Sequence, residues 1–584
     1  MSKYDKLSNE ELLRLIEQQE IELETKKYGL VRNKEKEPEK VVLECEHNLP
    51  ILERVFKKEI KTDETDDNIL IEWDNYHALT VLNYTHSEKI DIIYIDPPYN
   101  TGNKDFIYND KYVDKEDGYR HSKRLNFMEK RLKLAKNILK KSGVIFISID
   151  DNEQSQLKLL CDGIFGENNF ISKIVIQSNP RWSQASKHLA EVHEYVLVYA
   201  KSSNDLNIEG LPKSEENLSE YSSTDKQGKK YRLLGLRQRG GERKREQRPN
   251  MFYPLYVNPK DNTISLQKTK THFIEALPKR PTGEEGRWTW SKDKVNSDIG
   301  LLIGKKVNRK DAKNFYDIFR VDYLSDEDGI ESMSKPKTIW LEKELNYQNG
   351  RNEIKDIFWE DLFDYPKPTF LIKKIVEMVG NKNALIVDFF CGSGTTGHAI
   401  LKLNNQDGWN RRFILCTNNE NKICEEVTYP RIKKVIKWYD KKTWDKEWIE
   451  WSWWNLQYFK TSLIKETVSR DQLKINLTGK CTEILCIKEN IFNLEQEKDD
   501  YKIFTSNQKD KYLCIHYNFK LNSFNEFIAN IKKIKWEKTI YTFSLDNVVD
   551  ESLFKWVDNF RIEPIPQNIL NVYKQLIILN IKNY

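Results

Sequence analysis

Short apolar runs alternate with amphipathic segments in two stretches of the chain, 68–200 and 366–416. Apolar, β-branched runs bounded by Pro, Gly or polar residues predict buried strands, and apolar residues spaced three or four apart predict helices. We therefore expect strands at 68–73, 91–95, 144–149, 195–199, 384–389 and 413–416, and helices at 76–82, 127–139, 371–378 and 396–403. This alternation is typical of an α/β fold with a doubly wound, mostly parallel sheet.

The rest of the chain departs from that pattern. Residues 201–337 contain few apolar runs and many polar, Gly, Pro and basic residues, which indicates an insertion. Strand-like runs at 483–487, 512–517, 539–543 and 560–564 and a closing helix at 569–579 predict a C-terminal α+β domain. We divide the chain into a helical N-terminal arm and linker (1–45), two halves of the α/β domain (46–200 and 341–440), the insertion (201–340) and the C-terminal domain (441–584).

Composition narrows the class of protein. Of 584 residues, 39% are hydrophobic and 32% charged, which excludes collagen-like, coiled-coil and wholly disordered chains. No apolar stretch is long enough to span a membrane, so we expect a soluble intracellular protein. The net charge of +5 does not by itself indicate a nucleic-acid partner. The eight cysteines form no CxxC pair, which predicts reduced, buried thiols and no metal site.

The first motif with clear chemistry is Asp96-Pro97-Pro98-Tyr99, at the end of the strand predicted at 91–95. Ligands of doubly wound sheets bind beyond the carboxyl ends of strands. The Asp96 carboxylate and the Pro97 carbonyl can accept both hydrogens of an exocyclic amino group, and Tyr99 offers a flat face to a base. Such a pocket receives a base only after it has left the duplex. The alternative is an ordinary Pro-Pro turn after a strand.

The second motif lies between the strand predicted at 384–389 and the helix predicted at 396–403. Glycines at such a turn let the backbone approach a ligand, and the helix N-terminus can receive an anionic group. Gly392, Gly394 and Gly397 also satisfy the GxGxxG pattern of dinucleotide sites, so glycine spacing alone does not identify the cofactor. The Asp-Pro-Pro-Tyr segment favours amine chemistry over hydride transfer. A turn without any ligand is the remaining alternative.

With both motifs in view, the chain resembles the beta-group amino DNA methyltransferases, which use S-adenosylmethionine. In that group Asp-Pro-Pro-Tyr precedes Phe-x-Gly-x-Gly, as it does here. More closely, the chain is similar to the modification (Mod) subunits of Type III restriction–modification systems. The closer resemblance is carried by Lys27–Val31, Glu153, Phe165–Phe170, His193–Tyr195, Arg248–Pro254 and Tyr365–Pro368. It implies a permuted, Rossmann-like methyltransferase fold.

The resemblance also assigns roles to individual residues. Lys367 and Pro368 match the segment that closes over the methionine end of the cofactor, Asp74 matches a Gly-Asp turn in which Trp73 replaces the glycine, and Glu420 matches the residue that binds the ribose hydroxyls. For Asp74 and Glu420 the alternative is a helix cap or a charge on a solvated loop. By position, the cofactor pocket would be lined by Asp388, Phe389, Phe390, Cys391, Gly392, Ser393, Gly394 and Thr395.

A basic cluster lies within the insertion. Ten Lys or Arg residues fall between 226 and 248, offset only by Glu242 and Glu246. Such a cluster can neutralise phosphates and contact guanine edges, although a solvated charge run is the usual alternative. In the family this insertion is the target-recognition domain. The candidate DNA-binding residues are Arg237, Arg239, Arg243, Lys244, Arg245 and Arg248. The Trp-rich stretch 438–454 is interpreted as packing rather than a stacking surface.

Residues and resemblance together predict a sequence-specific DNA adenine-N6 methyltransferase. Asp96 and Pro97 would bind the amino hydrogens, Pro98 would hold their geometry and Tyr99 would stack on the flipped base, with no metal required. The implied partners are double-stranded DNA, a second copy in a homodimer and a restriction (Res) helicase–nuclease subunit, in the bacterial cytoplasm. The alternatives are an N4-cytosine methyltransferase, an orphan epigenetic methyltransferase and a recognition scaffold for a nuclease–helicase.

Overall fold

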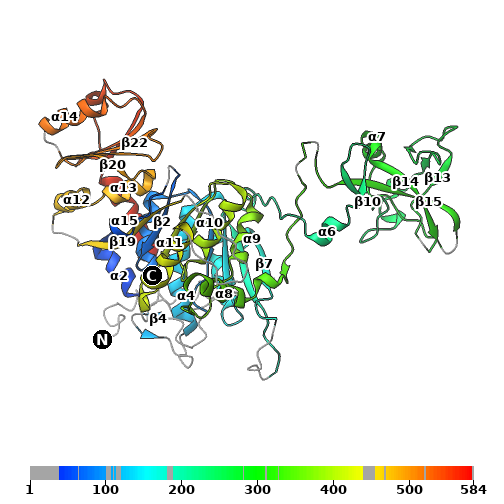
Figure 1. The fold of residues 1–584 in the computed structure, drawn as a ribbon, viewed down its shortest axis with the longest axis horizontal. Helices are drawn as coiled ribbons and strands as arrows, with labels where there is room; N and C mark the ends of the chain where they lie inside the picture. The colour runs from blue at the N-terminus through cyan, green and yellow to red at the C-terminus, as the bar shows by residue number, and fades with distance from the viewer. Residues whose placement is uncertain are drawn as a thin grey trace, which may run out of the picture. The chain divides into compact units, whose positions relative to one another are not determined.

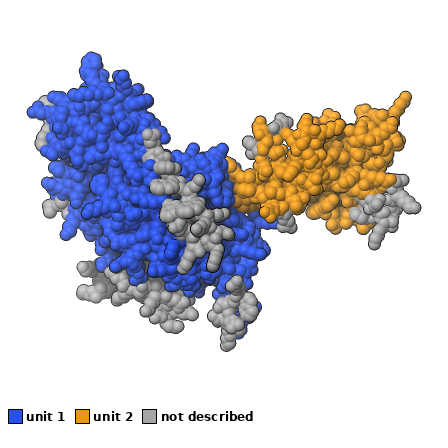
Figure 2. All heavy atoms as spheres, in the orientation of Figure 1, with its two compact units in different colours: residues 1–208, 337–584 blue, residues 209–336 orange. Residues whose placement is uncertain are grey.

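The computed structural model describes residues 39–581 except 63–64, 100–106, 109–110, 113–119, 181–187, 281, 310–311, 327, 330, 438–453, 466–468 and 519–520. The chain divides into two compact units, 1–208 with 337–584 and 209–336, which are coloured separately in Figure 2. The helical pattern predicted within 1–30 and nearly all of the Trp-rich stretch lie outside the described residues.

A ten-stranded sheet forms the centre of the first unit (Figure 1). Six neighbouring strands of this sheet run parallel: β19, β2, β18, β17, β3 and β6. Strands β1 and β8 are antiparallel to their neighbours. The prediction of a doubly wound, mostly parallel sheet is therefore confirmed. In spatial order the strands are β1 (Asn48–Arg54), β19 (Asn455–Lys465), β2 (Asp67–Glu72), β18 (Arg412–Thr417), β17 (Leu385–Asp388), β3 (Ile90–Ile95), β6 (Leu139–Ile149), β8 (Glu194–Ala200), β7 (Phe170–Ile176) and β16 (Ile339–Trp340).

Helices cover both faces of this sheet. On β18 the side chains alternate: Ile414 and Cys416 share a core with the first helical layer, whereas Phe413 and Leu415 face Gly397 of the second. This alternation follows from the two-residue period of a strand. The first layer contains α2 (Lys40–His47), α3 (Asn75–Thr85), α4 (Arg120–Ile138) and α5 (Gln154–Phe165), and the second contains α8 (Tyr347–Phe358), α9 (Thr369–Val379), α10 (Thr395–Asp407) and α11 (Tyr429–Lys437).

The order of the strands reverses its direction between β3 and β17. From β3 the chain runs through α4 to β6 on one side, whereas from β17 it runs through α10 to β18 on the other side. Crossovers that leave two neighbouring strands in opposite directions, on opposite faces, leave an opening at the carboxyl ends of those strands. Both predicted motifs follow these two strands.

The C-terminal segment does not begin where the composition changes. β19 pairs with β2 in the central sheet, so this sheet continues beyond the boundary predicted at 440. Helices α13 and α15 pack on α3, and their apolar residues belong to the same core as the sheet. The elements that follow β19 are α12 (Arg470–Thr478), α13 (Thr482–Glu489), β20 (Asn493–Glu497), β21 (Tyr501–Thr505), β22 (Lys511–His516), α14 (Leu521–Ile531), β23 (Glu537–Phe543), β24 (Phe560–Ile565) and α15 (Gln567–Ile581).

One predicted strand of this segment is wrong. Residues 483–487 form part of helix α13. The run from Ile484 to Ile487 is completely buried, between the central core and the five-stranded C-terminal sheet. Four consecutive apolar residues are too few to show a helical period, so such a run in a short helix cannot be distinguished from a buried strand.

The second unit, Glu209–Pro336, contains small antiparallel sheets around a core centred on the fully buried Trp288. In the sequence this unit lies between the two parts of the first unit, within residues 201–340. Its elements are α6 (Glu215–Ser219), β9 (Ser223–Thr224), β10 (Lys230–Gly235), β11 (Leu255–Val257), β12 (Ile264–Ser265), β13 (Ile274–Ala276), α7 (Lys292–Ser297), β14 (Leu302–Arg309) and β15 (Ala312–Tyr323).

Two findings concern the expectations from composition. All eight cysteines are buried and free, as their spacing predicts. Within the described ranges, no helix combines the length and apolar character needed to cross a membrane.

Candidate active site

Both motifs lie at the same edge of the central sheet. Asp96 directly follows β3, and Asp388 is the last residue of β17. These strands are parallel neighbours, with Ile92 opposite Ile386 and Ile93 opposite Val387. Their carboxyl ends therefore lie side by side, and residues 96–99 and 388–395 follow the same edge of the sheet.

The glycine turn is tightly constrained. Gly392 and Gly394 adopt φ values of 45° and 79°, a left-handed region that favours glycine. The Gly394 N–H donates to the Cys391 carbonyl at 2.7 Å and closes the turn before α10. Beneath it, the fully buried Arg431 donates to Thr395 Oγ1 at 2.8 Å and to Ser393 Oγ at 3.1 Å. This turn is thus held from below by a buried cation.

Asp388 anchors the same turn from the strand side. Its carboxylate accepts hydrogen bonds from the Phe390 N–H, at 3.0 Å, and from the Thr396 hydroxyl. Burial raises the pKa of Asp388 to about 7, even though both hydrogen bonds favour the charged form. The side chain therefore titrates near neutral pH.

The Asp-Pro-Pro-Tyr segment leaves two acceptors open. Arg124 of α4 donates through Nε to the Pro98 carbonyl at 2.7 Å. No donor among the described residues reaches the Pro97 carbonyl, and none reaches Oδ2 of Asp96. Both contacts of the Asp96 carboxylate, from Tyr99 Oη at 2.8 Å and Lys367 Nζ at 3.1 Å, are made to Oδ1. Among the described residues, one carboxylate oxygen and one carbonyl oxygen of this segment thus have no donor.

Lys367 connects the two motifs. Its buried ammonium donates to Tyr99 Oη at 2.7 Å and pairs with Asp96, whereas its backbone carbonyl accepts a hydrogen bond from Thr395 Oγ1 at 3.2 Å. Burial opposes the charge on Lys367, but the carboxylates of Asp96 and Glu194 outweigh it and raise the pKa of Lys367 well above its ordinary value. Lys367 therefore stays charged beside Asp96.

The sequence did not predict two residues that join Asp96, Tyr99 and Lys367 here, Glu194 and Tyr347. Glu194, the first residue of β8, is buried and accepts from Tyr99 Oη at 3.1 Å and from the hydroxyl of Tyr347. Its only sequence signal is its place in the segment His193–Tyr195 of the family resemblance. Tyr347 begins α8 and has no such signal. Gly350 lets α8 approach the 366–367 backbone, because a Cβ there would collide with the Pro366 carbonyl.

Comparison with known proteins identifies the family. The sequence matches the N6/N4 DNA methylase family over residues 90–429, which include both motifs and the insertion. The chain belongs to this family. The EcoPI Mod subunit of Escherichia phage P1, a Type III restriction–modification enzyme, is 32% identical over 466 residues, which cover 73% of this chain and 71% of that protein. The resemblance to Mod subunits is thereby confirmed.

Relatives of this DNA methylase also include Type II methyltransferases. The Type II methyltransferase M.KpnI of Klebsiella pneumoniae is 37% identical over 370 residues, 63% of this chain and 84% of that protein. Among solved structures, the M1.HpyAVI–SAM complex is 12% identical with a TM-score of 0.26, covering 63% of this chain and all of that chain. The PvuII cytosine-N4-specific DNA methyltransferase is 11% identical with a TM-score of 0.31, covering 64% and 94%.

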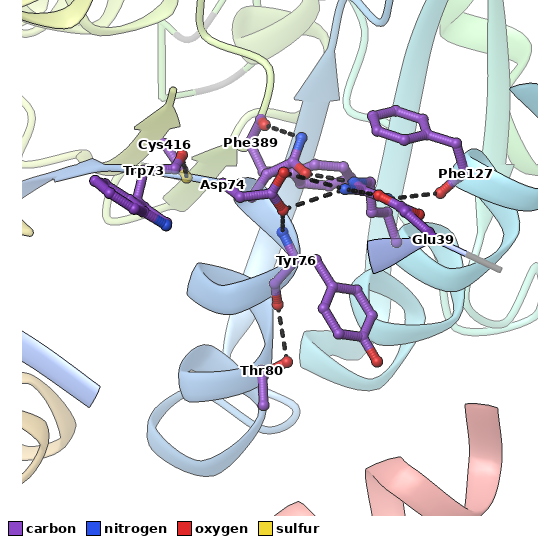
Figure 3. A network of polar contacts seen from close by, with 10 residues as sticks. Glu39, Trp73, Asp74, Tyr76, Thr80, Phe127, Phe389 and Cys416 are labelled. Carbon is purple, nitrogen blue, oxygen red and sulfur yellow. Dashed lines mark hydrogen bonds and ion pairs between the residues drawn. The ribbon is translucent and has the colours of Figure 1, made fainter. Parts of the chain in front are cut away.

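Asp74 of the methylase follows β2 and belongs to a buried polar network (Figure 3). Its carboxylate caps α3 by accepting from the Tyr76 N–H at 2.7 Å and pairs with Arg131 at 3.1 Å. Arg131 also binds Glu39, and Asn75 donates to the Phe389 carbonyl at 3.0 Å. Asp74 is thus a helix cap that connects to the glycine turn, and its contact with a cofactor stays a prediction.

The structure also places Trp73 and Glu420, which the resemblance singled out. Trp73, which stands where the family has glycine, adopts a φ of 147°, inside the region that glycine tolerates best. Glu420 is exposed and begins a short 3₁₀ helix after β18, Glu420–Lys422. Because β18 is the parallel neighbour of β17, Glu420 follows the same edge of the sheet. Its role in binding ribose remains a prediction.

The candidate DNA-binding residues of the second unit have different surroundings. Arg237 is largely buried, and its side chain lies 3.8 Å from Asp317 and donates to the Lys279 carbonyl. Its backbone forms an isolated β-bridge with Trp288. The exposed Arg245 and Arg248 pair with Glu285 and Glu242, at 2.7 and 3.2 Å. Arg239, Arg243 and Lys244 are exposed, and the described residues provide them with no carboxylate partner. Their charges are the ones most accessible to a phosphate.

Proposed function

We propose that this DNA methylase transfers a methyl group from S-adenosylmethionine to the N6 amino group of adenine within a specific sequence of double-stranded DNA. The observation that carries the proposal is the pair of open acceptors at the end of β3, Asp96 Oδ2 and the Pro97 carbonyl, beside the glycine turn that follows β17. The family includes both N6 and N4 enzymes, so the choice of adenine rests on the aspartate at the first position of the motif.

Two acceptors suit the chemistry of an exocyclic amine. The lone pair of this nitrogen is delocalised into the ring, which makes the amine a poor nucleophile. If Asp96 and Pro97 each accept one amino hydrogen, the nitrogen turns toward a tetrahedral geometry and its lone pair is localised. The negative charge of Asp96 then stabilises the positive charge that develops on nitrogen, so the interaction strengthens toward the transition state.

Other residues of the segment would receive the base. The aromatic ring of Tyr99 lies next to both acceptors, with its hydroxyl fixed by Asp96, Glu194 and Lys367. A purine can stack on such a ring, provided that it has first left the duplex. Arg124 keeps the Pro-Pro turn in place through the Pro98 carbonyl. These contacts fix the acceptors and the ring before a base arrives.

The residues at the glycine turn fit S-adenosylmethionine. A Cβ built on Gly392 would make only ordinary van der Waals contacts, with Phe363 at 3.7 Å and the Phe390 carbonyl at 3.9 Å, so no atom crowds the turn on that side. Asp388 and Phe390 belong to this turn, which leads into the N-terminus of α10, and Lys367 connects the turn to Asp96 through its backbone carbonyl and its ammonium. When bound there, the cofactor supplies an electrophilic methyl group. The chain's part is to hold it beside the acceptors.

Product analysis tests the proposal. The purified protein is incubated with unmethylated plasmid DNA and S-adenosylmethionine, and the nucleosides are then separated and identified by mass. We expect N6-methyladenine. N4-methylcytosine as the sole product would contradict the choice of base, and the absence of any methylated nucleoside would contradict the function as a whole.

We infer further that the protein is the Mod subunit of a Type III system, which reads the DNA sequence for a Res helicase–nuclease and acts as a homodimer. Similarity to the EcoPI Mod subunit over most of both chains supports this inference. A sedimentation mass equal to two chains of 69.5 kDa each is expected. In the assembled complex, Asp96→Ala should stop methylation while restriction persists, because recognition belongs to the other unit.

A free-standing methyltransferase is the second candidate. It is favoured by the similarity to M.KpnI, a Type II enzyme of which this chain covers 84%. The neighbouring reading frames discriminate the two candidates: a helicase–nuclease gene beside this one supports the Mod assignment, and its absence supports the second candidate.

A further inference from the structure

Asp96 belongs to a buried cluster of charged and tyrosine side chains that also contains Lys367, Tyr99, Tyr347 and Glu194. Glu194 Oε2 accepts hydrogen bonds from Tyr99 and Tyr347 and lies 3.2 Å from Lys367 Nζ. The side chains of Glu194 and Lys367 are only 3% and 6% exposed. Four elements contribute: the loop after β3, the start of β8, the start of α8 and the loop before α9.

Lys367 and Tyr99 connect the two carboxylates of this cluster. Lys367 Nζ donates to Tyr99 Oη at 2.7 Å and forms ion pairs with Asp96 Oδ1 at 3.1 Å and with Glu194 Oε2 at 3.2 Å. Burial raises the pKa of Tyr99 and of Tyr347 well above the ordinary value, so both hydroxyls keep their protons; the one hydrogen of Tyr99 can go to Asp96 Oδ1 at 2.8 Å or to Glu194 Oε2 at 3.1 Å. Among the described residues of the cluster, two carboxylates share one ammonium.

This balance of charge matters for Asp96. With Glu194 present, Lys367 is divided between two carboxylates, and one net negative charge remains at the end of β3. Without the charge of Glu194, the ammonium would have Asp96 as its single ionic partner. Asp96 would then be neutralised by Lys367, and it would lose the charge that stabilises a positively charged amine.

We propose that Glu194 is a positioning residue for Asp96: it holds Lys367 and Tyr99 so that both engage Oδ1 of Asp96, which leaves Oδ2 directed to the amino group of the base and leaves Asp96 negatively charged. This inference rests on the proposed function of Asp96 as an acceptor of amino hydrogens. Glu194 itself needs no contact with the base or the cofactor, because it acts through Lys367 and Tyr99.

The experiment measures single-turnover methyl transfer from labelled S-adenosylmethionine to unmethylated plasmid DNA, together with cofactor affinity by calorimetry. Glu194→Gln keeps the shape of the side chain and removes its charge. We expect transfer to slow about 10²-fold, because small errors in the placement of a reacting group have costs of this size, with cofactor affinity nearly unchanged. Transfer at the wild-type rate would overturn the proposal.

Asp162→Asn is the matched control. Asp162 of α5 also accepts from a tyrosine hydroxyl, Tyr199 Oη at 2.7 Å, and from a lysine, Lys158 Nζ at 2.7 Å. Tyr199 lies at the far end of β8, the strand that begins with Glu194. The substitution therefore breaks the same kind of Tyr–Lys–carboxylate cluster away from Asp96. It should leave the rate of transfer within about threefold of wild type; a loss as large as that of Glu194→Gln would show that any such cluster matters and would overturn the specific role.

The double variant Glu194→Gln/Lys367→Met separates positioning from a merely structural role. If Glu194 acts through Lys367, the losses caused by the two substitutions should not multiply, because the effects of groups in contact are not additive. The double variant should then lose less activity than the product of the two single losses, measured with Glu194→Gln and Lys367→Met. Losses that multiply would overturn the proposal.

Two further measurements keep the outcome decisive. If Glu194→Gln does not fold, Tyr347→Phe removes the one hydroxyl that Tyr347 donates to Glu194, and we expect a loss of about fivefold at an unchanged melting temperature. A wild-type rate would overturn the inference.

An inactive wild type, or an active Asp96→Asn variant, would instead refute the proposed function. An active wild type with an inactive Asp96→Asn and a normal Glu194→Gln refutes the role of Glu194 alone.

Discussion

At the residue scale, the edge of the sheet at the end of β17 contains a carboxyl group that is costly to ionise. Asp388 is buried at the end of β17, and its raised pKa means that the folded state binds a proton more tightly than the unfolded chain. Asp388 nevertheless accepts two hydrogen bonds that hold the turn. A buried group retained under such conditions is typical of a functional site.

The pH dependence of stability tests this assignment. Below a pH of about 4 the proton is bound in both states, and between about 4 and 7 the folded state alone binds it. The contribution of Asp388 to the free energy of unfolding is therefore full at low pH and is lost as the pH rises to about 7, at roughly 1.4 kcal/mol per pH unit.

Thermal unfolding of wild type and of Asp388→Asn from pH 4.5 to 8.5 provides the measurement, since the amide does not titrate. The melting temperature of wild type relative to Asp388→Asn should fall as the pH rises to 7 and then level off. A difference that does not change with pH would show that Asp388 has an ordinary pKa.

Single residues were predictable to different degrees. Asp96 and the glycines at 392 and 394 were identified because short motifs place them after recognisable strands. Tyr347 was not, because it meets Glu194 only when α8 packs beside the catalytic edge, a contact between residues 153 positions apart. Long-range contacts of this kind leave no local pattern in a single sequence.

At the element scale, α10 has a left-handed glycine at each end. Gly394 precedes its first turn with φ 79°, and Gly408 ends it with φ 71°. A Cβ at Gly394 would meet Thr428 at 3.2 Å, whereas a Cβ at Gly408 would meet no atom within 4 Å. The two positions therefore share backbone strain but differ in their surroundings.

Alanine at each position separates strain from function. Both Gly394→Ala and Gly408→Ala should lower the free energy of unfolding by about 1–2 kcal/mol, the cost of a left-handed non-glycine residue. Only Gly394→Ala should also weaken the binding of S-adenosylmethionine, by about tenfold or about 1.4 kcal/mol. Calorimetric titration measures this difference. Equal affinity in the two variants would mean that the turn before α10 does not contact the cofactor.

Elements were predicted well where the periodicity was unambiguous. The strands β2, β3, β17 and β18 were all expected from short apolar runs, and they are the strands that place the site. Helix α13 was mistaken for a strand because its centre, Ile484–Ile487, is a continuous apolar run. β19 was missed because a strand that joins a sheet from a distant part of the chain has no signal that names its neighbour.

At the scale of the whole molecule, the chemistry and the proposed DNA recognition belong to different units. The first unit contains both motifs, and the second contains the exposed Arg243 and Lys244. Because the second unit is inserted between the two halves of the catalytic fold, its charge cluster is tied to that fold at both ends. Sequence composition revealed the insertion, but the ion pairs of Arg245 and Arg248 required the structure.

Salt dependence tests the DNA contact. If Arg243 and Lys244 each neutralise one phosphate, alanine at both positions should lower the slope of log affinity against log salt by about 1.8 in magnitude. Binding to a labelled DNA duplex at several salt concentrations gives this slope. Alanine at the exposed neighbours Lys532 and Lys533 of the first unit is the matched control. An equal change in both double variants would place the contact elsewhere.

The central claim is that Asp96 prepares an amino group for methylation beside a cofactor bound at the glycine turn. Asp96→Asn replaces one acceptor oxygen by a donor and removes the charge, with little change in shape. Single-turnover methyl transfer to unmethylated DNA, measured with cofactor affinity, is the most direct test. The account predicts a loss of at least about 10²-fold in transfer with unchanged affinity; transfer at the wild-type rate would contradict it.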